Sequence, residues 1–423
     1  MLDLAVDGLK ASDNRCSKAQ TAAAANGIIE GNGRIRLPGF PSVLPKGLGD
    51  VSTLEHYLPL ADLQARVLEA SRILDRYRSS LRLNAPAPDR HSRQNPKLPG
   101  SGDPSATYET GMTRENFQKP LTPLTPSPLT DHLYYKREDL TITKAYKVRG
   151  AVVGMAKMLE NQTATRFLGV STGNHALGIL KAAELLKPDG VRVVIPSNTS
   201  ECKRLKLSLA MAKLETLGVE ARLEVQGNTF NEARDWAIKN TEPGEYYLDP
   251  YGDPWVVAGQ GTIGVELLNQ LAPLVRAGNY EELLVVSPIG GGGLLTGTAT
   301  AMKMLASWNP TFKNVNLRFV GLRLLDLESP LGDAIRVTKM EPANETTLRA
   351  LGVQVAEMSD QDMEAGLGFV NHELGLDVEG ASGGTLSPVL FRLDCLPSEK
   401  RLVVCLLSGA NTNPSNEPAP VCV

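Results

Sequence analysis

Residues 282–297 read ELLVVSPIGGGGLLTG, an apolar run followed by four consecutive glycines and the start of a helical pattern. Glycines let a backbone approach a ligand closely, and a helix N-terminus adds a positive dipole end. The stretch therefore predicts a phosphate cradle at Gly290, Gly291, Gly292 and Gly293. A flexible strand-to-helix turn is an equal alternative. The GK[ST] ending of a nucleotide-binding loop is absent from it.

Strand-to-helix junctions recur on both sides of this stretch. The β-rich runs LYYK (133–136) and VRVVIP (191–196) alternate with helical patterns such as KVRGAVVGMAKMLE (147–160). Strands separated by helices of this length indicate βαβ units and a parallel sheet covered on both faces. Ligands of such sheets lie beyond the carboxyl ends of the strands. The residues thus predict an α/β fold with a site at that edge.

A lysine stands at one of these junctions, in the segment KREDLTITKAYKVRGA (136–151). A single lysine at a helix start is usually a solvated surface residue. Lys147 differs from that case because Tyr146 precedes it, Arg149 and Gly150 follow it, and a phosphate-type loop lies later in the chain. A lysine that attacks an aldehyde must lose its proton, which requires partial burial or nearby positive charge.

Two further junctions carry polar residues. STGNHALG (171–178) offers hydroxyls, a carboxamide and backbone N–H groups that suit a carboxylate, although the same residues could simply cap a helix. RLVVCLLSGAN (401–411) places the hydroxyl of Ser408 at the end of an apolar strand. Taken alone, a strand followed by an ordinary turn explains that second segment better than a binding site does.

Composition narrows the class of protein. The 423 residues are 42% hydrophobic and 22% charged, with a net charge of −3, so nothing indicates a nucleic-acid partner or an acidic membrane surface. The five cysteines show no paired spacing, which favours a reducing compartment. No apolar run approaches the ~18–20 residues that span a bilayer. With Asp3, Asp7 and Asp13 arguing against a transit peptide, we expect a cytoplasmic protein.

In this order, the four segments resemble the fold-type II pyridoxal-phosphate (PLP) enzymes, and most closely the threonine dehydratases. The family carries KREDL, SFKxRGA, GNHAQG, AGQGTI, GGGGL and SGAN motifs. This chain has the corresponding segments KREDL (136–140), YKVRGA (146–151), STGNHALG (171–178), AGQGTIGVEL (258–267), GGGGLLTG (290–297) and SGAN (408–411). The resemblance covers roughly 55–80 and 120–411, and it implies a two-lobed, tryptophan synthase β-like fold with parallel-rich twisted sheets covered by helices.

The resemblance also implies how the chain divides. We expect an irregular extension over 1–52, a large PLP-binding domain over 53–168 and 247–411, a small domain over 169–246 and a tail over 412–423. A helix is predicted from Leu54 to Arg78 by its apolar spacing. The polar, Pro-rich stretch 80–118 reads as a flexible insertion.

Carried over by position, the family's site residues make Lys147 the catalytic Schiff-base lysine. The proposed cofactor contacts are Asn174 on the phenolic oxygen, Gly290 to Gly293 on the phosphate, Ser408 on the pyridine nitrogen and Tyr146 against the ring. The proposed contacts of the substrate carboxylate are Ser171, Thr172, Gly173 and His175.

Ser408 bears on the reaction type. A serine hydroxyl is neutral, so it cannot keep the pyridine nitrogen protonated as an aspartate would. The ring is then a weaker electron sink, which favours expulsion of a β-group. We therefore expect β-elimination from a hydroxy amino acid, most simply L-threonine to 2-oxobutyrate and ammonia. The resemblance adds a homodimer and a place in isoleucine biosynthesis.

Several residues depart from the family pattern. Ala145 replaces a serine and Leu177 a glutamine, which leaves the substrate less defined than the cofactor. Arg323 stands where the serine racemase branch has a metal-binding glutamate, so no metal site is expected. Serine dehydratase or racemase activity stays open, because Thr172 carries a hydroxyl where the racemases have serine. A catalytically dead binding protein is the third alternative.

Overall fold

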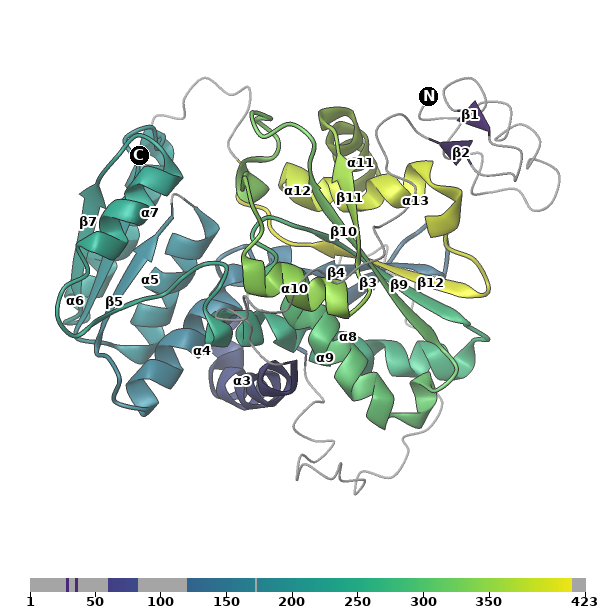
Figure 1. Ribbon diagram of the computed structural model, residues 1–423, viewed down its shortest axis with the longest axis horizontal. Coiled ribbons are helices and arrows are strands. Elements are labelled where there is room, and N and C mark those ends of the chain that lie inside the picture. The colour runs from purple at the N-terminus through teal and green to yellow at the C-terminus, as the bar shows by residue number, and fades with distance from the viewer. Residues whose placement is uncertain (1–27, 30–34, 37–59, 83–119, 172, 413–423) are drawn as a thin grey trace, which may run out of the picture.

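In the computed structural model, the described residues are 28–29, 35–36, 60–82, 120–171 and 173–412. They form two main sheets that lie side by side, each covered by helices (Figure 1). Within the predicted N-terminal extension, β1 (Ile28–Ile29) and β2 (Ile35–Arg36) form a short antiparallel pair. The remainder of residues 1–52 lies outside the described residues. No helix of the described ranges is long and apolar enough to cross a membrane.

The larger sheet has six strands within the described residues, and all neighbouring strands run parallel except β3 and β4. In order across the sheet they are β11 (Gln354–Met358), β10 (Asn316–Leu324), β9 (Glu282–Pro288), β12 (Arg401–Leu407), β4 (Leu133–Arg137) and β3 (Leu124–Pro126). The expected α/β fold with parallel-rich, helix-covered sheets is confirmed.

Helices cover both faces of this sheet because its central strands are apolar at nearly every position. Side chains alternate between the two faces of a strand. On β9, Leu283 and Val285 pack with α8 and α9, whereas Leu284 and Val286 pack with α11 and α13. The helices are α3 (Leu60–Leu81), α8 (Pro254–Ala277), α9 (Gly293–Trp308), α10 (Pro342–Ala350), α11 (Asp360–Leu374), α12 (Gly380–Gly383) and α13 (Ser387–Phe391). Short 3-10 helices are η3 (Glu138–Leu140), η4 (Pro310–Phe312), η5 (Asp333–Ile335), η6 (Gly384–Leu386) and η7 (Leu393–Cys395).

The smaller sheet is parallel throughout, in the order β7-β6-β5-β8. Its elements, with α4 beside them, are α4 (Lys147–Glu160), β5 (Arg166–Val170), α5 (Asn174–Leu186), β6 (Gly190–Ile195), α6 (Glu201–Thr216), β7 (Glu220–Val225), α7 (Phe230–Lys239) and β8 (Glu245–Tyr247). Helices α4, α5 and α6 pack on one face, and α7 packs on the other. We propose that this sheet is the small lobe predicted over 169–246, with the remainder of the core as the large lobe.

The predicted element bounds hold where the apolar pattern is strong. The helix predicted over 147–160 is α4, and the strand predicted over 191–196 is β6. The helix predicted to end at Arg78 continues to Leu81, because Leu81 is fully buried and its carbonyl accepts a hydrogen bond from the Ile142 N–H. The predicted insertion therefore starts later than expected. Residues 83–118 lie outside the described residues.

Helix α8 is an element that the sequence analysis did not predict. Its glycines disfavour a helix in isolation, but they lie where α8 crosses its neighbours. A Cβ on Gly259 would lie 2.7 Å from the Gly150 Cα of α4, and one on Gly261 would lie 2.9 Å from the Gly297 carbonyl oxygen of α9. The glycines thus allow three helices to pack with their backbones close together.

A network of buried charges joins these helices to β4. The Arg149 guanidinium of α4 is fully buried, and it donates to Glu138 Oε2 and to Glu266 Oε1 of α8, each at 2.8 Å. Lys136 of β4 donates to the other oxygen of Glu266 at 2.6 Å. Two cations thus balance two carboxylates, and Thr122 Oγ1 donates to Glu138. Burial opposes ionisation, but Arg149 and Lys136 hold the pKa of Glu266 well below its usual value.

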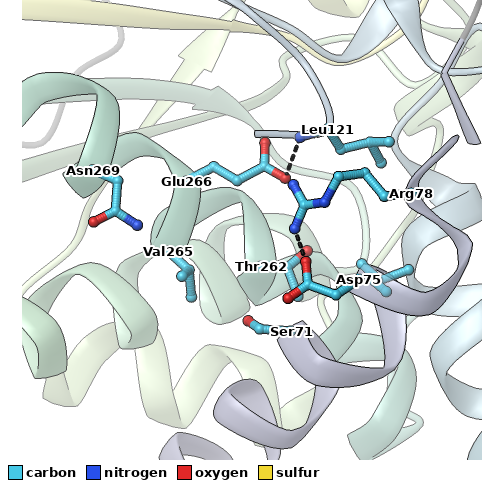
Figure 2. A pocket seen from close by; sticks show the side chains of 9 residues that line it. Ser71, Asp75, Arg78, Leu121, Thr262, Val265, Glu266 and Asn269 are labelled. Carbon is cyan, nitrogen blue, oxygen red and sulfur yellow. Dashed lines mark hydrogen bonds and ion pairs between the residues drawn. The ribbon is translucent and has the colours of Figure 1, made fainter. Parts of the chain in front are cut away.

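Glu266 also lines a small cavity between α3 and α8 (Figure 2). The Leu121 N–H donates to Glu266 Oε1 at 2.8 Å. On the facing helix α3, Arg78 pairs with Asp75, which lies one turn before it. The cavity is about 20 Å³, which is room for about one water molecule. It is too small for an amino acid, so this face of the network supports the fold.

Replacing Arg149 with methionine tests the network. Arg149→Met keeps most of the side-chain volume but leaves two carboxylates facing each other without their shared cation. We expect the free energy of unfolding, measured with urea, to fall by about 3–5 kcal/mol. The control Arg349→Met removes an exposed i,i+4 ion pair with Glu345 and should change stability by less than about 1 kcal/mol. Equal losses in the two variants would contradict the role given to Arg149.

Candidate active site

Lys147 is the first residue of α4, and its side chain is buried. Its Nζ donates to the Pro250 carbonyl at 2.9 Å and lies 5.2 and 4.7 Å from the ring centres of Tyr146 and Tyr251. Burial lowers the pKa of Lys147 to about 8, against the attraction of Asp249. A much larger fraction of neutral amine is therefore present near neutral pH than for an exposed lysine. That is the state in which an amine attacks a carbonyl carbon.

The four glycines form the turn between β9 and α9, as the sequence predicts. Gly292 has φ of 94°, a conformation that residues with a Cβ rarely adopt. A Cβ on Gly291 would lie 2.3 Å from Tyr251 Cγ, so a side chain there would displace that ring. Among the described residues, the N–H groups of Gly290, Gly291 and Gly292 donate to no backbone or side-chain acceptor. Free N–H groups at a helix N-terminus suit a phosphate group.

Asn344 of α10 holds this loop in place. Its Nδ2 donates to the carbonyls of Gly291 and Tyr251, each at 2.8 Å. The glycine turn is therefore tied to the segment that follows β8, where Tyr251 and the acceptor of Lys147 lie. Sequence reasoning missed Asn344 and Tyr251. Tyr251 stands just before a Pro-initiated helix, which is a junction signal, but Asn344 carries no comparable signal.

The polar segment after β5 lies at the start of α5. Ser171 Oγ accepts a hydrogen bond from the Gly173 N–H at 3.2 Å, and Asn174 is the first residue of the helix. Thr172, between them, lies outside the described residues. These backbone and hydroxyl groups stand at the carboxyl end of a parallel strand, where such sheets bind ligands.

The imidazole of His175 is buried. Its Nε2 bonds to the Leu248 carbonyl at 2.8 Å, which leaves Nδ1 without a partner among the described residues. Burial and the nearby Lys147 charge lower its pKa to about 4, so the ring is neutral. If His175 contacts a substrate carboxylate, its backbone is the available group.

Ser408 follows β12 and lies directly beside the lysine segment. Its carbonyl accepts a hydrogen bond from the Tyr146 N–H at 3.1 Å. Its hydroxyl is buried and lies 3.1 Å from Ser382 Oγ, so its hydrogen-bond partner is another neutral hydroxyl. Ser382 in turn bonds both the carbonyl and the N–H of Gly409. Sequence reasoning did not assign a role to Ser382, which stands in the small-residue run ASGG.

Comparisons with known proteins show the family and the fold. The family model described as "Pyridoxal-phosphate dependent enzyme" matches residues 115–409. An L-threonine ammonia-lyase of Thermotoga maritima is 28% identical over 292 residues, covering 66% of this chain and 67% of that one. The solved T.th. threonine deaminase is 30% identical with a TM-score of 0.54, covering 70% of this chain and 94% of that chain. A processed threonine deaminase of Solanum lycopersicum, 23% identical with a TM-score of 0.56, covers 69% of this chain and 84% of that one and shares the fold.

Covalent trapping tests the reactivity of Lys147. Borohydride reduction in the presence of PLP should attach one pyridoxyl group to Lys147, and mass spectrometry of the digest should locate it. The labelling rate should rise with pH up to about 8 and level off above it, because deprotonation of the amine limits the reaction. Lys147→Ala should lose the label, whereas the control Lys144→Arg, at an exposed position nearby, should keep it. A label on another residue of the wild-type protein would refute the assignment.

Proposed function

The chain belongs to the pyridoxal-phosphate dependent enzymes, and we propose that it is an ammonia-lyase that converts L-threonine to 2-oxobutyrate and ammonia. Relatives named for threonine breakdown support the substrate. The single observation that carries the reaction type is the neutral hydroxyl pair of Ser408 and Ser382 next to the lysine segment.

PLP, when bound, supplies an aldehyde that condenses with amines and a ring that withdraws electrons from the substrate's Cα. Lys147 is the group that would take the Cα proton, because burial keeps part of its amine neutral. The glycine turn would hold the phosphate through its free N–H groups, and Tyr146 would pack against the ring. Ser171 and Gly173, with Thr172, would bind the substrate carboxylate.

The hydroxyl of Ser408 favours elimination over transamination in this proposal. A hydroxyl cannot supply a permanent proton to the pyridine nitrogen, because its own pKa lies far above neutral pH. The ring would then stabilise negative charge at Cα only weakly, and this favours expulsion of the β-hydroxyl. Loss of that group, followed by hydrolysis, gives the keto acid and ammonia.

The proposal extends to the compartment, the assembly and the pathway of the protein. We propose a cytoplasmic homodimer with a role in isoleucine biosynthesis; the compartment is supported by three free cysteines in the described part of the chain, Cys202, Cys395 and Cys405. Serine dehydratase or racemase activity is the alternative, with the hydroxyl of Thr172 as its candidate second acid.

Product analysis decides between these activities. The PLP-loaded protein is incubated separately with L-threonine, L-serine and D-serine, and the keto acids and serine enantiomers are identified by chromatography. We expect 2-oxobutyrate from L-threonine as the fastest product. Formation of D-serine from L-serine as the main reaction would replace the proposal with a racemase. Bound PLP with no product from any of the three would indicate a non-catalytic binding protein.

Ser408→Asp tests the argument on reaction type. The variant places a carboxylate where we propose the pyridine nitrogen binds, which favours the protonated ring. It should still bind PLP, but its elimination rate should fall well below that of the wild type. Ser408→Ala removes one hydrogen bond, worth roughly 0.5–1.5 kcal/mol, and should weaken PLP binding without changing the product. Unchanged kinetics in Ser408→Asp would show that Ser408 does not adjoin the ring nitrogen.

Chelation tests the proposed independence of metal ions. Arg323 lies half-buried on β10, and its guanidinium has no lone pair to offer a cation. Rates and melting temperatures should therefore be the same in EDTA and in added Mg²⁺ or Ca²⁺. Rescue of a chelated, inactive protein by either ion would overturn the inference from Arg323.

A further inference from the structure

Asn174, Glu379 and Asn411 form a closed hydrogen-bonded ring beside the candidate site. Asn174 and Glu379 take part through their side chains, and Asn411 takes part through its side chain and its backbone N–H. Asn174 Nδ2 lies 2.8 Å from Glu379 Oε1 and 3.1 Å from Oε2. Asn411 Nδ2 donates to Asn174 Oδ1 at 2.8 Å, and the Asn411 N–H donates to Glu379 Oε1 at 3.0 Å. Each member therefore bonds to both others.

The ring bridges the two lobes. Asn174 begins α5 of the small sheet, whereas Glu379 immediately precedes α12 and Asn411 follows β12 of the large sheet. Asn411 Nδ2 also donates to the Thr143 carbonyl at 2.8 Å, in the loop that leads to Lys147. The ring thus connects Asn174 to the lysine segment.

Space around Glu379 is restricted. Its N–H donates to the Gly409 carbonyl at 3.0 Å, and a Cβ on Gly409 would lie 3.0 Å from both carboxylate oxygens. A glycine is therefore required at position 409 if the carboxylate is to keep this place. The carboxylate cannot move away without breaking the ring.

Glu379 is buried with amides as its hydrogen-bond partners in the described part of the chain. The charged groups on other elements that interact electrostatically with Glu379 are Asp333 of η5 and Lys203 of α6, which pair with each other, and the Tyr146 phenol also interacts with Glu379. A buried carboxylate without a paired cation is strongly disfavoured in its charged form. Burial accordingly raises the pKa of Glu379, and the bond from Asn174 opposes the change.

We infer that Glu379 and Asn411 are positioning residues that hold the Asn174 amide in a single orientation, and that ionisation of the buried Glu379 carboxyl opposes binding of the cofactor there. The Asn174 oxygen is occupied by Asn411, so its NH₂ group is directed to Glu379 and to the place of the ligand. Oε1 accepts two hydrogen bonds and Oε2 accepts one longer bond. The inference rests on the proposed contact of Asn174 with the cofactor's phenolic oxygen.

The charge on Glu379 matters because the phenolic oxygen is electron-rich. A carboxylate at this position would repel that oxygen and compete with it for the Asn174 N–H groups. PLP affinity should therefore fall as pH rises through the titration of Glu379. Lys147 also titrates, so the informative quantity is the ratio of affinities between a Glu379 variant and the wild type at each pH.

Thermal melting of the full-length protein freed of cofactor tests whether folding raises the pKa of Glu379 in the absence of any ligand. A carboxyl whose pKa is raised by folding contributes stability that is present at low pH and lost as pH rises through the folded pKa. Glu379→Gln is neutral at all pH values. The melting temperature of Glu379→Gln minus that of the wild type should therefore increase from mildly acidic to mildly alkaline pH. A difference that is constant or decreases with pH would contradict a raised pKa of Glu379 in the folded protein.

Equilibrium titration with PLP tests the positioning role. The affinity of Glu379→Gln relative to the wild type should rise several-fold across the same pH range. Asn411→Ala should weaken binding several-fold at every pH, because it frees the Asn174 oxygen. The control Glu345→Gln, at an exposed helix position, should follow the wild type throughout. A pH-independent ratio for Glu379→Gln, or unchanged affinity in Asn411→Ala, would overturn the inference.

These outcomes are separable from those of the proposed function. If the pH-dependent ratio is found but no keto acid forms from any hydroxy amino acid, the ring stands and the ammonia-lyase proposal fails. If 2-oxobutyrate forms but the ratio is flat, the ammonia-lyase proposal stands and the role of Glu379 fails.

Discussion

The structure depends on the salt bridge that Arg149 makes to two carboxylates in a fully buried place. Glu138 is the first residue of η3, directly after β4, and Glu266 comes from the middle of α8. The guanidinium of α4 thus joins three elements, of which α8 is distant in sequence. Arg149 lies in the first turn of α4, two residues after Lys147. Because the first turn of α4 cannot shift without uncovering buried charge, the amine of Lys147 is held in a defined place.

Parallel strands from both sheets bring segments that are distant in sequence to the candidate site. β9 ends at the glycine turn, β12 ends at Ser408, and β5 ends just before Ser171. All three strands deliver polar groups or free N–H groups at their carboxyl ends, which is where a parallel sheet leaves room for a ligand. Burial then sets the chemistry there, since it lowers the pKa values of Lys147 and His175 and raises that of Glu379.

Prediction from the sequence succeeded where local pattern and tertiary structure agree. The bounds of α4 follow from its apolar spacing, and β6 follows from a run of Val and Ile that is buried on both faces. It failed for α8, whose glycines argue against a helix although they face Gly150 and Gly297 at helix crossings. The reason is that glycine's cost is local, whereas the close packing that it permits involves residues far away in the sequence.

The sequence by itself determined the α/β class and the order of the junctions, and it made Lys147, Asn174 and Ser408 candidate site residues, because each stands in a short motif that resembles the family's. Only the tertiary structure decided their partners. Tyr251, Asn344, Ser382 and Glu379 reach the site from segments whose letters are ordinary for turns and helices. Hydrogen-bond partners and burial depend on distances between remote residues, and the chain acquires these distances only when its two sheets and their helices pack.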